Sequence, residues 1–80
     1  MPHDKNNVKI RVGDVIKAPA LNPALNGDDT VLVGRVLVLM EGQSCSGRLA
    51  HITKYGGIQI DYFSAADAEI IYSPSAVENK

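Results

Sequence analysis

His51 and Asp61 are the two residues of this chain best suited to carry out chemistry. They stand on either side of Tyr55-Gly56-Gly57, and a hairpin through that turn would bring them together on adjacent strands. A carboxylate beside an imidazole orients the ring and favours its charged form, which suits general acid–base work. The same contact could equally be a structural cross-strand pair that contributes a few tenths to about 1 kcal/mol. The sequence leaves both interpretations open.

The pattern of apolar residues predicts the register of this hairpin. With Tyr55-Gly56-Gly57 as a three-residue loop, Ile52 faces Ile60 and Ala50 faces Tyr62. A two-residue loop would mix apolar and polar side chains on one face, because a one-residue slip inverts a whole strand. The other face is expected to point outward, and it carries Leu49, His51, Thr53, Gln59, Asp61 and Phe63.

Thiol and metal chemistry have little support in the residue types. The chain has one cysteine and two histidines, and it contains no CxxC or HxxxH spacing. A structural zinc site needs four ligands, so no metal and no cofactor are expected. Cys45 cannot form an intramolecular disulfide, and the first seven residues are polar. We therefore expect a cytoplasmic protein that acts in a reducing compartment.

Length and charge limit the remaining classes of function. Eighty residues make one domain with a small core. The net charge is −1, whereas nucleic-acid binders usually carry a basic patch and a high pI. Nucleic-acid binding through Lys9, Arg11 and Arg48 is therefore a minor alternative. The longest apolar run, Val31 to Met40, is much shorter than the roughly 20 residues of a membrane helix.

The composition predicts an all-β fold. Eight Val and seven Ile outnumber six Leu, and β-branched residues suit a pleated, half-buried surface. Between a polar tail at 1–7 and another at 73–80, we expect one domain over 8–72. Strands are expected at Val8–Val12 continuing into Val15–Ala18 after a bend at Gly13-Asp14, and at Thr30–Glu41, Arg48–Lys54, Ile58–Phe63 and Ala68–Tyr72. A long loop over Pro19–Asp29, a turn over Gly42–Gly47 and a 3₁₀ turn over Ser64–Asp67 connect them.

This order of elements resembles a single SH3-like barrel. The resemblance is carried by the order itself and by Ile-Gln-Ile-Asp-Tyr-Phe-Ser-Ala-Ala-Asp-Ala-Glu-Ile-Ile at 58–71. It implies about five short strands that roll up, with a 3₁₀ turn before the last strand. Such a fold hosts many functions and implies none.

Surface character gives the leading functional hypothesis. Both faces of the Thr30–Glu41 strand are largely apolar. Either the barrel bends enough to bury both faces internally, or one face is left as an exposed apolar patch, which marks an interaction site. We expect a small non-enzymatic module that binds a protein partner or a second copy of itself, as phage and mobile-element accessory proteins do. Its candidate binding residues are Arg35, Arg48, His51, Tyr55, Gln59, Asp61 and Phe63.

A second hypothesis is an enzyme. The stretch Ile58-Gln59-Ile60, with Gly13-Asp14, resembles the plasmid-type dihydrofolate reductases, which carry Val-Gln-Ile-Tyr around a pore shared by four subunits. The resemblance implies NADPH as cofactor, with Gln59 and Ile60 at the pore. Asp61 stands in place of the family's Tyr, and Ala18 stands in place of its pore lysine.

Overall fold

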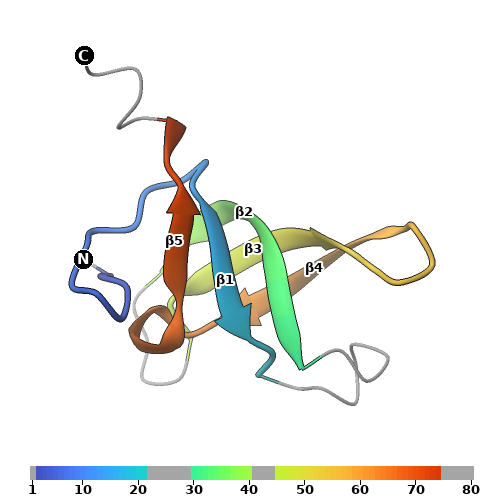
Figure 1. Ribbon diagram of the computed structural model, residues 1–80, viewed down its shortest axis with the longest axis horizontal. Coiled ribbons are helices and arrows are strands. Elements are labelled where there is room, and N and C mark those ends of the chain that lie inside the picture. The colour runs from blue at the N-terminus through green and yellow to red at the C-terminus, as the bar shows by residue number, and fades with distance from the viewer. Residues whose placement is uncertain (1, 22–29, 41–44, 75–80) are drawn as a thin grey trace.

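Five antiparallel strands form one sheet in the computed structural model, which describes residues 2–21, 30–40 and 45–74 (Figure 1). The elements are β1 (Val15–Pro19), β2 (Val31–Leu39), β3 (Gly47–Ile52), β4 (Ile58–Phe63), the 3₁₀ turn η2 (Ala65–Asp67) and β5 (Glu69–Tyr72). The order across the sheet is β4-β3-β2-β1-β5. The prediction of an all-β fold with a 3₁₀ turn before the last strand is confirmed. Among the described residues β4 and β5 do not pair with each other, so the sheet is open.

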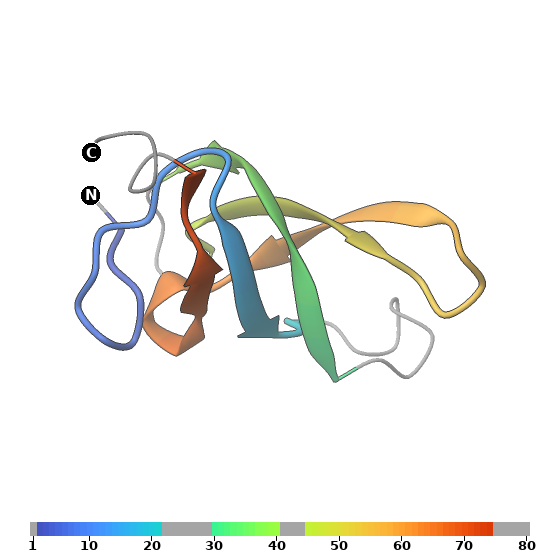
Figure 2. The same ribbon diagram turned by 45° about the horizontal axis from the view of Figure 1, so that its top comes forward.

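The long strand β2 serves both halves of the sheet. Its first part, Val31–Arg35, pairs with β1, and its second part, Gly34–Leu39, pairs with β3. Gly34 lies where the two pairings overlap, and a Cβ atom there would collide with the carbonyl oxygen of Ala50. Close approach of two backbones is a common reason for glycine within a strand. The strong bend of β2 is visible in Figure 2.

A β-bulge interrupts the alternation of β2. The register with β3 shifts between Val36 and Val38, so Leu37 is an extra residue in the ladder. Before the bulge, Leu32 and Val36 are buried, and after it Leu39 packs against the core while Val38 is exposed. Strict alternation along β2 would place Val38 on the face of Leu32 and Val36, and the bulge prevents this.

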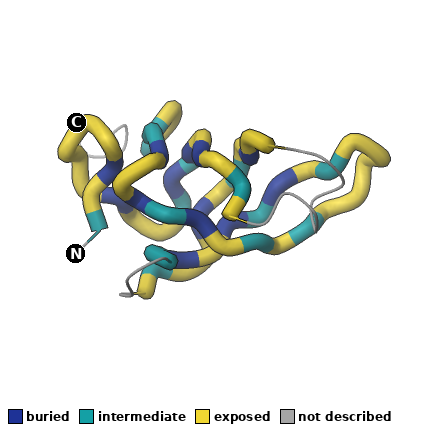
Figure 3. Tube along the Cα trace, turned by 90° about the horizontal axis from the view of Figure 1, so that it is seen from below, coloured by how far each residue is buried: buried dark blue, intermediate teal, exposed yellow. Residues whose placement is uncertain are grey.

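The core is small, and its buried positions come from the N-terminal segment, from β1 to β4 and from the region of η2 (Figure 3). Phe63 and Leu49 are 0% exposed, so the expectation that they lie on an outward surface is wrong. The buried hydrophobic residues are Ile10, Ile16, Ala18, Leu32, Val36, Leu49, Phe63, Ala65 and Ala68.

The predicted strand at Val8–Val12 is not formed. Asp4 is buried, and its Oδ1 accepts hydrogen bonds from the backbone N–H groups of Asn6 and Val8, both at 2.9 Å. Its Oδ2 accepts a bond from the N–H of Ile70 in β5 at 3.1 Å. A carboxylate that binds nearby backbone amides offers the chain an alternative to a strand ladder. The first residues therefore form turns that pack beside β5.

The Asp14 carboxylate, like that of Asp4, anchors the N-terminal segment by accepting local and long-range hydrogen bonds. Its Oδ2 accepts a bond from the Arg11 N–H at 2.9 Å, and its Oδ1 accepts one from the Ser73 hydroxyl at 2.7 Å. Gly13 has φ of 98°, which confirms the tight bend expected before β1. Most of the predicted Pro19–Asp29 loop and of the 73–80 tail lies outside the described residues, as does half of the Gly42–Gly47 turn.

Candidate interaction surface

The β3–β4 hairpin turns through Lys54-Tyr55-Gly56. The Gly56 N–H donates to the Thr53 carbonyl at 2.9 Å, and the Thr53 N–H donates to the Gly57 carbonyl at 2.7 Å. Gly56 has φ of 86°, a conformation that favours glycine at the last position of a three-residue loop. The predicted loop length is therefore right, but the loop begins one residue earlier than expected.

That displacement shifts the register by two residues. The structure pairs Ile52 with Ile58 and Ala50 with Ile60. Because the shift is an even number, every side chain stays on the face predicted for it. The orientation of the two faces, however, is the reverse of the one expected, since the face with Phe63 packs inward.

His51 and Asp61 are in contact on the inward face. His51 Nε2 lies 2.6 Å from Asp61 Oδ2, and Gln59 Nε2 donates to the same oxygen at 2.8 Å. The His51 side chain is 2% exposed and that of Asp61 is 18% exposed. The imidazole therefore has little access to a substrate, and this arrangement favours the structural interpretation of the pair.

The outward face of the hairpin is strongly apolar. Ile52 and Ile58 face each other and are 74% and 78% exposed. Ile60 is 56% exposed and Tyr62 is 46% exposed beside them on β4. Large apolar side chains that gather on one exposed face mark an interaction surface. Sequence analysis did not select Ile52 or Ile58 as site residues, and it placed Ile60 only at the pore of the enzyme alternative, although the alternation of isoleucines with the polar positions of β4 is plain.

Cationic and aromatic groups border these isoleucines. Arg48 donates from Nη2 to the Tyr62 hydroxyl at 3.0 Å, and its guanidinium lies 5.0 Å from the centre of the Tyr62 ring. Arg35 is exposed on the same face, because it pairs with Ala50. Tyr55 at the tip of the hairpin is 86% exposed, and Lys54 Nζ lies 5.2 Å from its ring centre.

The structure thus divides the predicted binding residues into two groups. Arg35, Arg48 and Tyr55 lie on the outward face or at the tip. The other four lie on the inward face, where Gln59 and Asp61 are half-buried, and His51 and Phe63 are buried. Gln59 and Ile60, which the enzyme resemblance would bring to one pore, point to opposite faces of β4.

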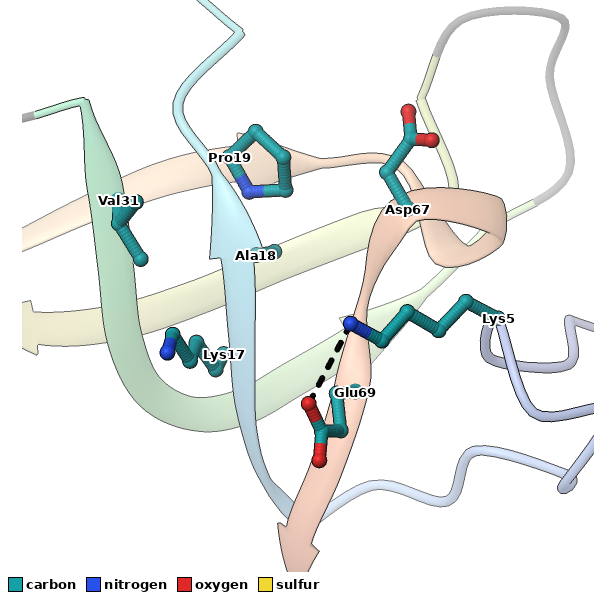
Figure 4. Close-up of a pocket in the computed structure, with 7 residues that line it drawn as sticks. All are labelled: Lys5, Lys17, Ala18, Pro19, Val31, Asp67 and Glu69. Carbon is teal, nitrogen blue, oxygen red and sulfur yellow. Dashed lines mark ion pairs between the residues drawn. The ribbon is translucent and has the colours of Figure 1, made fainter.

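A small pocket lies elsewhere, between β1, η2 and the N-terminal segment (Figure 4). It has a volume of about 140 Å³, and an ion pair of 3.4 Å between Lys5 and Glu69 closes one side. Ligand pockets usually measure roughly 300–1,000 Å³. The described residues contain no group of three or more His, Cys, Asp or Glu side chains that could hold a metal. Nor do they include a helix with the length and apolarity to cross a membrane.

Comparisons with protein-family models, with curated proteins and with solved structures return no match for this chain.

Proposed function

We propose that this protein is a non-enzymatic protein-association module that binds through the outward face of its β3–β4 hairpin. This hairpin face consists of Arg48, Ile52, Ile58, Ile60 and Tyr62. The observation that carries the proposal is the exposure of three isoleucines on one side of a two-stranded ribbon. Burial of apolar surface contributes roughly 25 cal/mol per Å², so covering this face would stabilise a complex.

The composition of the hairpin face supports this function. Interfaces are enriched in aromatic residues and arginine, and the residues that dominate binding energy are often Tyr and Arg. Tyr62 and Arg48 are such residues, and their mutual hydrogen bond holds both side chains in place before a partner arrives. Preorganised side chains lose less conformational entropy on binding.

The position of the hairpin also supports it. In Figures 1 and 2 the tip of the hairpin extends beyond the other strands, so a partner can approach it without meeting the rest of the domain. Tyr55, at that tip, would contribute to the rim of the contact. The single cysteine is consistent with action in a reducing compartment such as the cytoplasm.

Photo-crosslinking in the cells that naturally make the protein tests this proposal. A benzophenone side chain is placed at Ile58, and in a matched control at Val8, which is 52% exposed in the N-terminal segment. We expect a discrete protein adduct from position 58 alone, and we expect Ile60→Asp in the same chain to abolish it. Equal adducts from both positions, or none from position 58, would contradict the proposal.

A further inference from the structure

In the described part of the chain, one edge of the sheet is covered and the other is open. At the β5 edge, the N–H of Ile70 is bound by the Asp4 carboxylate, and the N–H of Lys5 donates to the Ala68 carbonyl at 2.8 Å. At the β4 edge, no strand from the described residues pairs on the outer side. An uncovered edge strand is a template for another chain, and proteins usually block it.

The hydrogen bond between Thr53 and Gly57 fixes which groups of β4 are open. Hydrogen-bonded pairs alternate along an antiparallel ladder, so Gln59, Asp61 and Phe63 direct their backbone groups toward β3. The N–H and C=O groups of the three intervening residues therefore point to the open side. These residues are Ile58, Ile60 and Tyr62, whose side chains also belong to the hairpin face.

We propose that the β4 strands of two copies of this chain pair edge to edge, antiparallel, about a two-fold axis at Ile60. This inference rests on the proposed function, and it identifies the protein partner of the hairpin face as a second copy of the chain. Ile60 then faces the partner's Ile60, and Ile58 faces the partner's Tyr62. All three residues use their open backbone groups, and the two five-stranded sheets become one sheet of ten strands.

Charge and geometry select this register over its neighbours. An axis at Asp61 would set the two Asp61 side chains directly opposite each other, and like charges in that position are destabilising. An axis at Gln59 would move Tyr62 beyond the partner's β4, opposite Gly56 in the turn. The axis at Ile60 instead places the amide of Gln59 opposite the carboxylate of the partner's Asp61.

The same register joins the two apolar faces. Ile52 already faces Ile58 within one hairpin, and Arg48 faces Tyr62. Pairing Ile58 with the partner's Tyr62 therefore creates a row of three apolar or aromatic side chains that ends at the partner's Arg48. Pairing Ile60 with the partner's Ile60 creates an apolar row across four strands, with Ala50 at each end. The exposed isoleucines of both copies meet at the centre of the new sheet.

Cysteine crosslinking in a Cys45→Ser background tests the register. In Ile60→Cys, the two introduced thiols belong to a hydrogen-bonded pair with Cα atoms about 5.5 Å apart, which is within disulfide range. In the matched variant Ile58→Cys, the two thiols are four positions apart along the strands, about 14 Å. We expect mild oxidation to convert most Ile60→Cys protein, and little Ile58→Cys protein, to a covalent dimer.

Amide hydrogen exchange of the unmodified protein supplies a backbone readout. Edge pairing should protect the amides of Ile58, Ile60 and Tyr62 as concentration rises, while those of Gln59 and Asp61 are protected at every concentration by β3. A dimer in which these three amides gain no protection, and in which position 60 does not crosslink preferentially, would overturn edge pairing. The proposed function would then still stand. A monomer at all concentrations would overturn the inference that the partner is a second copy of the chain. Photo-crosslinking from position 58 in cells would still decide the proposed function.

Discussion

His51 and Asp61 are joined by a contact of 2.6 Å although they do not face each other across the ladder. His51 faces Gln59, and Asp61 faces Leu49, so the contact runs diagonally between β3 and β4. Long side chains can span such diagonal positions. The carboxylate thereby binds both His51 and Gln59 beneath the sheet, and we assign this cluster to stability.

Replacement of Asp61 should reveal that role. Asp61→Ala leaves the buried imidazole of His51 without its partner, and an unsatisfied buried polar group costs about 1–3 kcal/mol. Urea unfolding should show a loss of this size, while Lys54→Ala, at the exposed turn, should change stability by less than about 0.5 kcal/mol. Equal stabilities for the two variants would argue against a structural role.

Phe63 and Tyr62 are neighbours with opposite expected effects. Phe63 is 0% exposed and fills the core, so Phe63→Ala should lower the free energy of unfolding by about 3–5 kcal/mol. Tyr62 is 46% exposed, so Tyr62→Ala should cost far less stability and should weaken association instead. Denaturant titration and sedimentation on both variants separate the two effects. Comparable stability losses would mean that the assignment of faces is wrong.

Gly34 should tolerate no side chain. A Cβ atom there collides with the Ala50 carbonyl, so Gly34→Ala should destabilise the fold by about 1–3 kcal/mol through overpacking. The matched control is Gly57→Ala, whose new Cβ would meet only Thr53 Oγ1 at 3.5 Å. Thermal unfolding of both variants checks the prediction, and a lower melting temperature for Gly57→Ala than for Gly34→Ala would contradict it.

Acid should weaken the anchor at Asp4. Burial acts to raise the pKa of Asp4, but hydrogen bonds from the amides of Val8, Ile70 and Asn6 hold it below its ordinary value of 3.8. The folded state therefore favours the charged carboxylate. This contribution to stability is present above pH 3.8 and is lost as the pH falls through the lower, folded value.

Thermal unfolding between pH 7 and pH 2 checks this dependence. The unmodified protein should lose more stability on acidification than Asp4→Asn does, because the variant has no carboxylate to protonate at position 4. Asp67→Asn, at an exposed position, serves as the control and should follow the unmodified protein. Parallel pH curves for Asp4→Asn and the unmodified protein would rule out Asp4 as the source.

Local pattern predicted the five strands of the sheet and the grouping of side chains on each face of the hairpin, but not which face is buried. Alternation groups Leu49 with Phe63 and Ile52 with Ile58, and both groups are apolar. The polar neighbours His51 and Asp61 suggested that the first group was exposed. In the structure these two satisfy each other, so the face can be buried. The choice between faces depends on packing against β1 and β2, which the hairpin sequence does not contain.

The N-terminal segment shows a different limit. The alternation of Val8, Ile10 and Val12 is that of a strand, but only Ile10 is buried. The carboxylates of Asp4 and Asp14 bind the amides that a strand would need for its ladder. Their long-range partners, Ile70 and Ser73, lie far along the chain, and a local pattern contains no information about them.

The contacts of those two carboxylates also determine when the N-terminal segment can take up its final place during synthesis. Asp4 is separated from Ile70 by 66 positions and Asp14 from Ser73 by 59, so both contacts can form only after β5 and Ser73 have been synthesised. Contacts of such high sequence separation slow folding. Until β5 emerges, neither carboxylate has its long-range partner, and the N-terminal segment is held only by its local turns. The N-terminal segment is therefore fixed against β5 only at a late stage of folding.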